Sequence, residues 1–169
     1  LRGLARGWEQ LPEAAAFDDA HRAWRQEIVE TAPGLPGWTR PEAAAGRTMS
    51  HGVAAKLINV YLKTLFAASV DADPARLDPV SAAKLDAIHP PIDRLLLDAL
   101  AKQDVGERRR SWRRFRDRGW SAFSSEDYEA VIALIREVTA RDHEGVESGG
   151  RGLWRIERYW PGYQGSQAE

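Results

Sequence analysis

Apolar residues along this chain recur at the spacing of helices. In several segments they repeat every three or four positions, and no convincing run of alternating β-branched residues occurs in the sequence. The pattern therefore predicts an all-α fold. We expect a compact helical domain over residues 1–163, with room for two lobes, and a polar C-terminal tail over residues 164–169.

Prolines, glycines and capping residues set the expected boundaries of the helices. Helices are predicted over residues 4–11, 18–31, 53–70, 90–106, 107–118, 124–141 and 153–160. Residues 38–51 are ambiguous, and a tight turn into the next helix is the favoured interpretation. Residues 71–88 are expected to form a loop or a short helix.

The helix predicted over 124–141 has the clearest pattern. Residues 124–127 have the form of a capping box. The apolar positions that follow predict one buried stripe, made of Tyr128, Val131, Ile132, Ile135 and Val138.

Composition narrows the class of protein. The chain has 169 residues, of which 43% are hydrophobic and 29% charged, as in ordinary globular domains. It has no cysteine, which excludes disulfides, thiolate zinc sites and cysteine-ligated iron–sulfur clusters.

The apolar run from Val53 to Val70 is interrupted by Lys56, Asn59 and Lys63, so no membrane span is expected. The N-terminus lacks the apolar core of a signal peptide, and a cytoplasmic location is the default expectation.

Arginines are concentrated in one segment. Residues 108–118 contain seven arginines, with Trp112 and Phe115 among them and Trp120 just beyond. Basic and aromatic groups together suit a phosphate backbone and stacked bases. An equally open interpretation is an amphipathic helix whose arginines are solvated and whose aromatic residues point into the core.

A polar stripe marks the most apolar predicted helix. The chain has four lysines against twenty arginines, and two of the four lie in this helix. At helical spacing, one narrow face carries Gly52, Lys56, Asn59 and Lys63. If this face meets water, its lysines simply extend outward into solvent. If it is buried, its lysines need a partner or a function.

Asp93 follows two prolines at the start of another predicted helix. Pro90 or Pro91 suits the first helical turn, and a carboxylate in that turn accepts free backbone N–H groups and favours the helix dipole. Asp93 is therefore expected to be ionised. Such a carboxylate is also a well-fixed partner for a nearby amine.

Two segments together resemble the helix-hairpin-helix DNA glycosylase superfamily, in particular its 8-oxoguanine type. The residues Gly52-Val53-Ala54-Ala55-Lys56 match the end of the family's hairpin, whose lysine begins a helix. The residues Pro91-Ile92-Asp93 match its Pro-Val-Asp segment, whose aspartate starts another helix. The resemblance covers about residues 46–100.

The resemblance implies a function and a set of site residues. Lys56 would attack the sugar C1′ of a flipped nucleotide and form a Schiff base, in a neutral state favoured by burial among Leu57 and Val60. Asp93 would orient the amine and stabilise positive charge. DNA would be bound by Gly52 and His51 beside the hairpin and by the arginine-rich helix, here represented by Arg109, Arg110 and Arg113. No cofactor or metal is implied.

The remaining histidines and aromatic residues are weaker candidates. His89 could line the same pocket, whereas His21 and His143 are expected at the surface, with no spacing that suggests a metal site. Trp154, Tyr159 and Trp160 are expected to pack against the core. The alternative to an enzyme is a non-catalytic helical domain that binds nucleic acid or protein. The sequence leaves the oligomeric state open.

Overall fold

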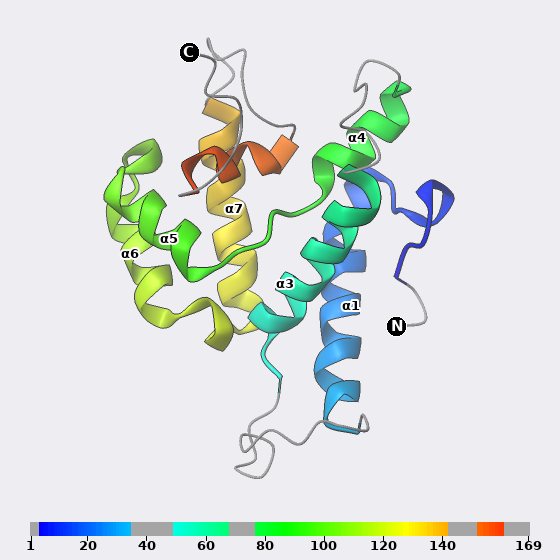
Figure 1. Cartoon of the computed structure of the whole chain (residues 1–169), viewed down its shortest axis with the longest axis horizontal. Helices are drawn as coiled ribbons and strands as arrows, with labels where there is room; N and C mark the ends of the chain where they lie inside the picture. The colour runs from blue at the N-terminus through cyan, green and yellow to red at the C-terminus, as the bar shows by residue number, and fades with distance from the viewer. Residues whose placement is uncertain (1–3, 35–48, 68–76, 142–151, 161–169) are drawn as a thin grey trace.

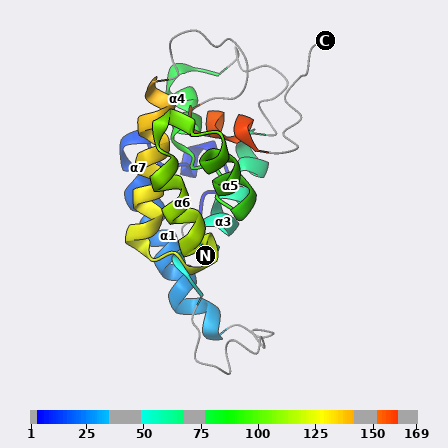
Figure 2. The ribbon, with the colours of Figure 1, turned by 90° about the vertical axis from the view of Figure 1, so that its left-hand side faces the viewer.

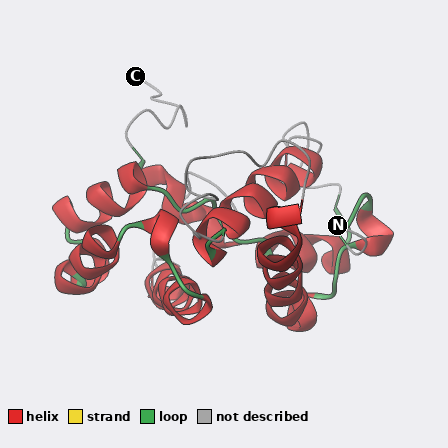
Figure 3. Cartoon of the chain, turned by 90° about the horizontal axis from the view of Figure 1, so that it is seen from below, coloured by secondary structure: helices red, strands yellow, loops and turns green. Residues whose placement is uncertain are grey.

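The protein is helical throughout the residues that its structure, a computed structural model, describes: 4–34, 49–67, 77–141 and 152–160. No strand occurs within these ranges, as the sequence predicts (Figures 1 and 3). The α-helices are α1 (Phe17–Thr31), α3 (His51–Leu62), α4 (Pro79–Ala87), α5 (Arg94–Lys102), α6 (Arg109–Arg118) and α7 (Ser125–Arg141). Short 3-10 segments include η1 (Trp8–Gln10), η2 (Ala14–Ala16), η3 (Ala32–Gly34), η6 (Val105–Glu107), η7 (Trp120–Ala122) and η8 (Gly152–Tyr159).

The helices surround two main hydrophobic clusters. One cluster joins α5, α6, α7 and η8, and Trp112 is its largest fully buried side chain. The other joins the N-terminal segment, α1, α3 and α4, around Phe17 and Phe66. In Figure 1 the two groups of helices lie on opposite sides, and the segment between α4 and α5 crosses from one to the other. Figure 2 shows the same helices from the α6 and α7 side.

Helix α7 forms as its sequence pattern predicts. The Ser124 hydroxyl accepts the Asp127 N–H at 3.1 Å, and the Asp127 carboxylate accepts the Ser124 N–H at 3.1 Å. This reciprocal pair is a capping box with aspartate in the place of glutamate. The predicted stripe from Tyr128 to Val138 is buried.

Two helix predictions were wrong at their boundaries. Residues 4–11 form only the single turn η1, and Pro12 ends that segment. Pro90 and Pro91 do not open a helix: the chain stays outside regular structure until Asp93, which is the N-cap of α5 rather than a first-turn residue. The reason is that Pro91 disfavours the helical conformation of the residue before it, while the Asp93 carboxylate accepts the Leu96 N–H and starts the helix.

Helix α3 buries the middle of its polar stripe and exposes several apolar residues. Asn59 and Gly52 are fully buried, whereas Leu57, Val60 and Tyr61 are 54%, 46% and 38% exposed. The solvated interpretation of the stripe is therefore wrong for Asn59 and Gly52, whereas the side chains of Lys56 and Lys63 are partly exposed, at 30% and 37%. The expected burial of Lys56 by Leu57 and Val60 is wrong as well, because these two side chains face away from the core.

The α3 helix continues into a π-helical turn, η4 (Lys63–Ala67). The helix was predicted to extend to residue 70, but residues 68–70 lie outside the described ranges. Within those ranges no helix is long and apolar enough to cross a bilayer.

Candidate functional site

The structure brings Lys56 and Asp93 together. The Lys56 Nζ lies 3.3 Å from the Asp93 Oδ2, and the side chains are 30% and 11% exposed. The other carboxylate oxygen, Oδ1, accepts the Leu96 N–H at 2.9 Å at the start of α5. This hydrogen bond at the start of a helix holds the Asp93 carboxylate in position beside the amine.

Trp120 and Gly52 complete the surroundings of this lysine. The Lys56 Nζ lies 4.7 Å from the centre of the Trp120 ring, a cation–π contact from η7. A β-carbon at Gly52 would lie 1.8 Å from the Trp120 carbonyl oxygen, so only glycine lets α3 approach η7 this closely. Gly52 thus sets the distance between the lysine helix and the aromatic ring over its amine.

A second lysine on the same face of α3 has a buried carboxylate as its partner. Lys63 forms an ion pair with Glu157 of η8, whose side chain is 2% exposed. Burial raises the pKa of Glu157 and the Asp93 charge raises it further, while Lys63 opposes both. The Glu157 Oε1 is buried and has no hydrogen-bond partner in the described part of the chain. Glu157 could not be predicted from the sequence, since a single glutamate in a short arginine-rich segment carries no signal of burial.

Asn59, which lies between the two lysines, holds α3 to three other elements. Its amide nitrogen donates to the Pro90 carbonyl at 2.8 Å and to the Tyr128 hydroxyl at 2.9 Å. Its carbonyl oxygen accepts from the His21 Nε2 at 2.8 Å. Pro90 is three residues before Asp93, and Asn59 is three residues after Lys56. The hydrogen bond from Asn59 to Pro90 therefore holds the segment that carries Asp93 against the helix that carries Lys56.

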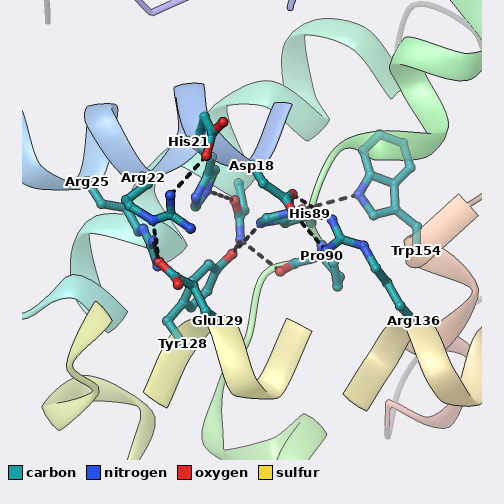
Figure 4. Close-up of polar contacts among 12 residues, drawn as sticks. Asp18, His21, Arg22, Arg25, His89, Pro90, Tyr128, Glu129, Arg136 and Trp154 are labelled. Atoms are coloured by element: carbon teal, nitrogen blue, oxygen red, sulfur yellow. Dashed lines mark hydrogen bonds and ion pairs between the residues drawn. The ribbon is translucent and has the colours of Figure 1, made fainter. Parts of the chain in front are cut away.

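The network continues from Tyr128 to the surface, as Figure 4 shows. The Tyr128 hydroxyl lies 3.1 Å from the His89 Nδ1, and the His89 Nε2 lies 3.0 Å from Asp18. Since Tyr128 accepts from Asn59, its own hydrogen is free to be donated to the His89 Nδ1, which leaves the Nε2–H to be donated to Asp18. Arg136 binds both oxygens of Asp18 at 2.6 and 2.7 Å.

Both histidines of this network are buried and neutral. Burial lowers the pKa of His21 well below its ordinary value, and it also lowers the pKa of His89, although Asp18 opposes the second shift. The expectation that His21 lies at the surface was wrong: it stacks on the Tyr128 ring, with ring centres 5.3 Å apart. His143 lies outside the described residues.

The arginine-rich helix combines both interpretations of its sequence. Trp112 and Phe115 are buried in the core. Four of its arginines have carboxylate partners: Arg108 with Glu137, Arg109 with Asp104, Arg116 with Asp98 and Asp117, and Arg118 with Asp127. Arg110 and Arg113 are exposed and form no ion pair with any described residue. Cations without a carboxylate are the ones that a phosphate backbone can use.

The other predicted DNA contacts lie beside the lysine. His51 is half-buried at the start of α3, and burial lowers its pKa. The Gly52 N–H donates to the Phe123 carbonyl at 3.3 Å. Packing against η7 therefore accounts for this glycine, and its contact with phosphate stays a prediction. Trp154 is buried and Trp160 packs against the first cluster.

The described residues include no group of three or more histidines, aspartates and glutamates placed to hold a metal ion. No known protein-family model matches the chain, and comparisons with curated proteins and with solved structures give no match.

Proposed function

We propose that this protein is a DNA glycosylase with lyase activity that acts on a modified base, with Lys56 as the nucleophile and Asp93 as its carboxylate partner. The observation that carries the proposal is the 3.3 Å contact between the Lys56 Nζ and the Asp93 Oδ2. These residues were paired from two short motifs that lie 37 positions apart. A chance match between motifs gives no reason for the side chains to meet.

The surroundings of the pair suit amine chemistry at a sugar carbon. Asp93 is fixed by its hydrogen bond at the start of α5, so its charge faces the amine and any positive charge that develops beside it. Lys56 is partly exposed at 30%, which leaves its nitrogen within reach of a substrate. As a neutral amine it would attack C1′, and the electron pair of the C1′–base bond would leave with the base.

Borohydride trapping on DNA with an abasic site tests this proposal. We expect the wild-type protein to give a covalent adduct, because the abasic aldehyde and the Lys56 amine form an imine that borohydride reduces. Lys56→Gln is expected to lose the adduct entirely. Lys84→Gln, which changes a lysine of α4 that is paired with Glu13, is the matched control and should keep the adduct. An adduct that survives Lys56→Gln, or none with the wild type, contradicts the proposal.

A second candidate function is a non-catalytic helical domain that binds nucleic acid. The observation that favours it is that Arg110 and Arg113 are exposed and have no ion-pair partner among the residues that the structure describes. This function needs only the cations and does not need the lysine. The two proposals are separated by trapping, since only the enzyme forms an adduct.

The contribution of these arginines to binding is measurable from salt dependence. The double variant Arg110→Gln/Arg113→Gln is expected to reduce the slope of log affinity against log salt by about 2, because each phosphate contact contributes about 0.9 to that slope. Filter binding or fluorescence anisotropy with a short duplex measures it. Arg108→Gln/Arg116→Gln removes two arginines that are already paired and should change the slope less. Equal slopes for all three proteins would show that Arg110 and Arg113 do not contact phosphate.

A further inference from the structure

A polar cavity of about 160 Å³ lies between α1 and α7, beside the buried network of Figure 4. Three buried side chains form its inner wall: His21, His89 and Tyr128. At its outer wall the two helices are joined by the ion pairs Arg22–Glu129 and Asp18–Arg136, whose side chains are all partly exposed. Arg22 also contacts Asp19, which is exposed to solvent. The cavity is therefore enclosed on one side by the core and separated from solvent on the other by ion pairs.

Arg25 brings a buried cation to this cavity, with only 1% of its side chain exposed. Its Nη2 donates to Glu129 at 2.9 Å and to the Ser125 hydroxyl at 3.2 Å, and its guanidinium lies over the Tyr128 ring. Its Nε and Nη1 are buried and have no hydrogen-bond partner in the described part of the chain. Arginine nitrogens donate and never accept, so both positions are suited to an acceptor that the chain does not supply.

The carboxylates around the cavity neutralise Arg25 only in part. One oxygen of Glu129 accepts from both Arg25 and Arg22. The other carboxylate, Asp18, is bound through both of its oxygens by Arg136. Three arginines and two carboxylates thus line the cavity. A buried cation with incomplete partners is costly, and a bound anion would remove that cost.

His21, one helical turn before Arg25, adds a buried acceptor that lacks a donor. The Asn59 amide nitrogen already donates to Pro90 and Tyr128, so the His21 Nε2 is the donor in its 2.8 Å bond to the Asn59 oxygen. The Nδ1 of this neutral ring then carries a lone pair. It is buried, with no hydrogen-bond partner among the described residues. A ligand that satisfies both side chains must accept from Arg25 and donate to His21.

We propose that this cavity binds a phosphate that keeps a proton, with Arg25 donating to its charged oxygens and its P–OH donating to the His21 Nδ1. Guanidinium groups match phosphate oxygens in geometry and charge. The cavity volume is well above the roughly 30 Å³ that one water takes up in the liquid, so an ion of several atoms has room. Water alone could fill the same space, but it would bring no charge to Arg25. This site does not depend on the chemistry proposed for Lys56.

Isothermal titration calorimetry with inorganic phosphate and with sulfate, in a buffer free of other oxyanions, tests the site. We expect one phosphate per chain, bound about 10-fold or more tighter than sulfate, because sulfate has no proton for the buried His21 Nδ1. Equal affinities for the two ions, or no phosphate binding at millimolar concentration, would overturn the inference.

Glycerol phosphate distinguishes a free ion from a phosphate monoester on a larger molecule. The ion pairs at the outer wall leave little room for an ester group, so we expect glycerol phosphate to bind more weakly than inorganic phosphate. Binding at least as tight as that of the free ion would identify a phosphate monoester as the ligand of the same site.

Arg25→Gln is expected to weaken phosphate binding by about 10-fold or more, because it removes a charged donor that is buried. The matched control is Arg110→Gln/Arg113→Gln, which removes two exposed cations of α6 and should bind phosphate as the wild type does. If Arg25→Gln folds and keeps the wild-type affinity, or if the α6 variant loses it, the inference is overturned while the proposed function stands. If Arg25→Gln does not fold, as circular dichroism would show, the wild-type preference for phosphate over sulfate decides.

Discussion

Replacement of Asn59 by leucine is expected to lower the free energy of unfolding by about 4 kcal/mol, because the buried groups left without a partner cost about 1–3 kcal/mol each. Asn59 makes hydrogen bonds to His21, Pro90 and Tyr128. Leucine is close to asparagine in size, so the loss comes from polar groups rather than from a cavity. Urea unfolding followed by circular dichroism measures the change.

The same substitution should also weaken imine trapping in the fraction of protein that stays folded. The bond from Asn59 to the Pro90 carbonyl holds the segment that leads into Asp93 against α3. Thr64→Ala, which removes an exposed hydroxyl bonded to the carbonyl four residues earlier, is the control and should cost less than about 0.5 kcal/mol. A loss below about 1 kcal/mol for Asn59→Leu would mean that water replaces the amide at all three positions.

The parts of the fold that could be predicted are those that local sequence determines. The capping box at Ser124 and the stripe that follows it define α7 without help from the rest of the chain. The aromatic residues of α6 alternate with arginines at helical spacing, and they are buried as an amphipathic pattern requires. In both helices the polar residues face solvent, which is the assumption behind every reading of periodicity.

Helix α3 departs from that assumption, and so the site could be predicted only in part. Each residue of its polar stripe has a partner that comes from a distant segment: Trp120 for Gly52, Asp93 for Lys56, the buried network for Asn59, and Glu157 for Lys63. The side of the helix that faces inward is therefore determined by partners in distant segments, which the periodicity of the helix itself does not indicate. Lys56 and Asp93 were paired because two motifs happened to mark them, whereas nothing marked Glu157.

His21 and Asp93 show two other limits. A histidine in the first half of an amphipathic helix looks like a surface residue. Its burial follows from partners that lie far along the chain, among them the Asn59 carbonyl 38 positions away and the Tyr128 ring. The two prolines before Asp93 look like a helix start, but the capping carboxylate places the start three residues later than Pro91. Both outcomes depend on hydrogen-bond partners, which composition and spacing do not specify.

The free energy of unfolding is expected to fall between pH 7 and pH 5. Each histidine that stays neutral in the folded protein lowers it by up to about 1.4 kcal/mol per pH unit below the unfolded pKa of that histidine. The folded-state pKa values of His21 and His89 are both lowered by burial from 6.5. Their contribution is complete above the unfolded value and is lost as the pH falls below it. Glu157, whose pKa is raised, changes stability in the opposite direction over this range and offsets part of the loss.

The carboxylates of the network titrate in a lower range and can be distinguished from the histidines. The pKa of Asp18 is lowered by its hydrogen bond to His89. Glu129 of α7 accepts from Arg22 of α1 at 2.7 Å, and this hydrogen bond lowers its pKa as well. The stability that these two carboxylates contribute is therefore lost only below their unfolded pKa values of 3.8 and 4.5. Urea unfolding at half-unit steps of pH measures the slope of the free energy of unfolding against pH. His21→Gln can still donate to Asn59 but cannot take up a proton, and it should lose at least half of the slope. A wild-type free energy of unfolding that stays constant between pH 7 and pH 5 would show that both histidines take up protons in the folded protein. A His21→Gln variant with the full wild-type slope would show that His21 does not contribute to it.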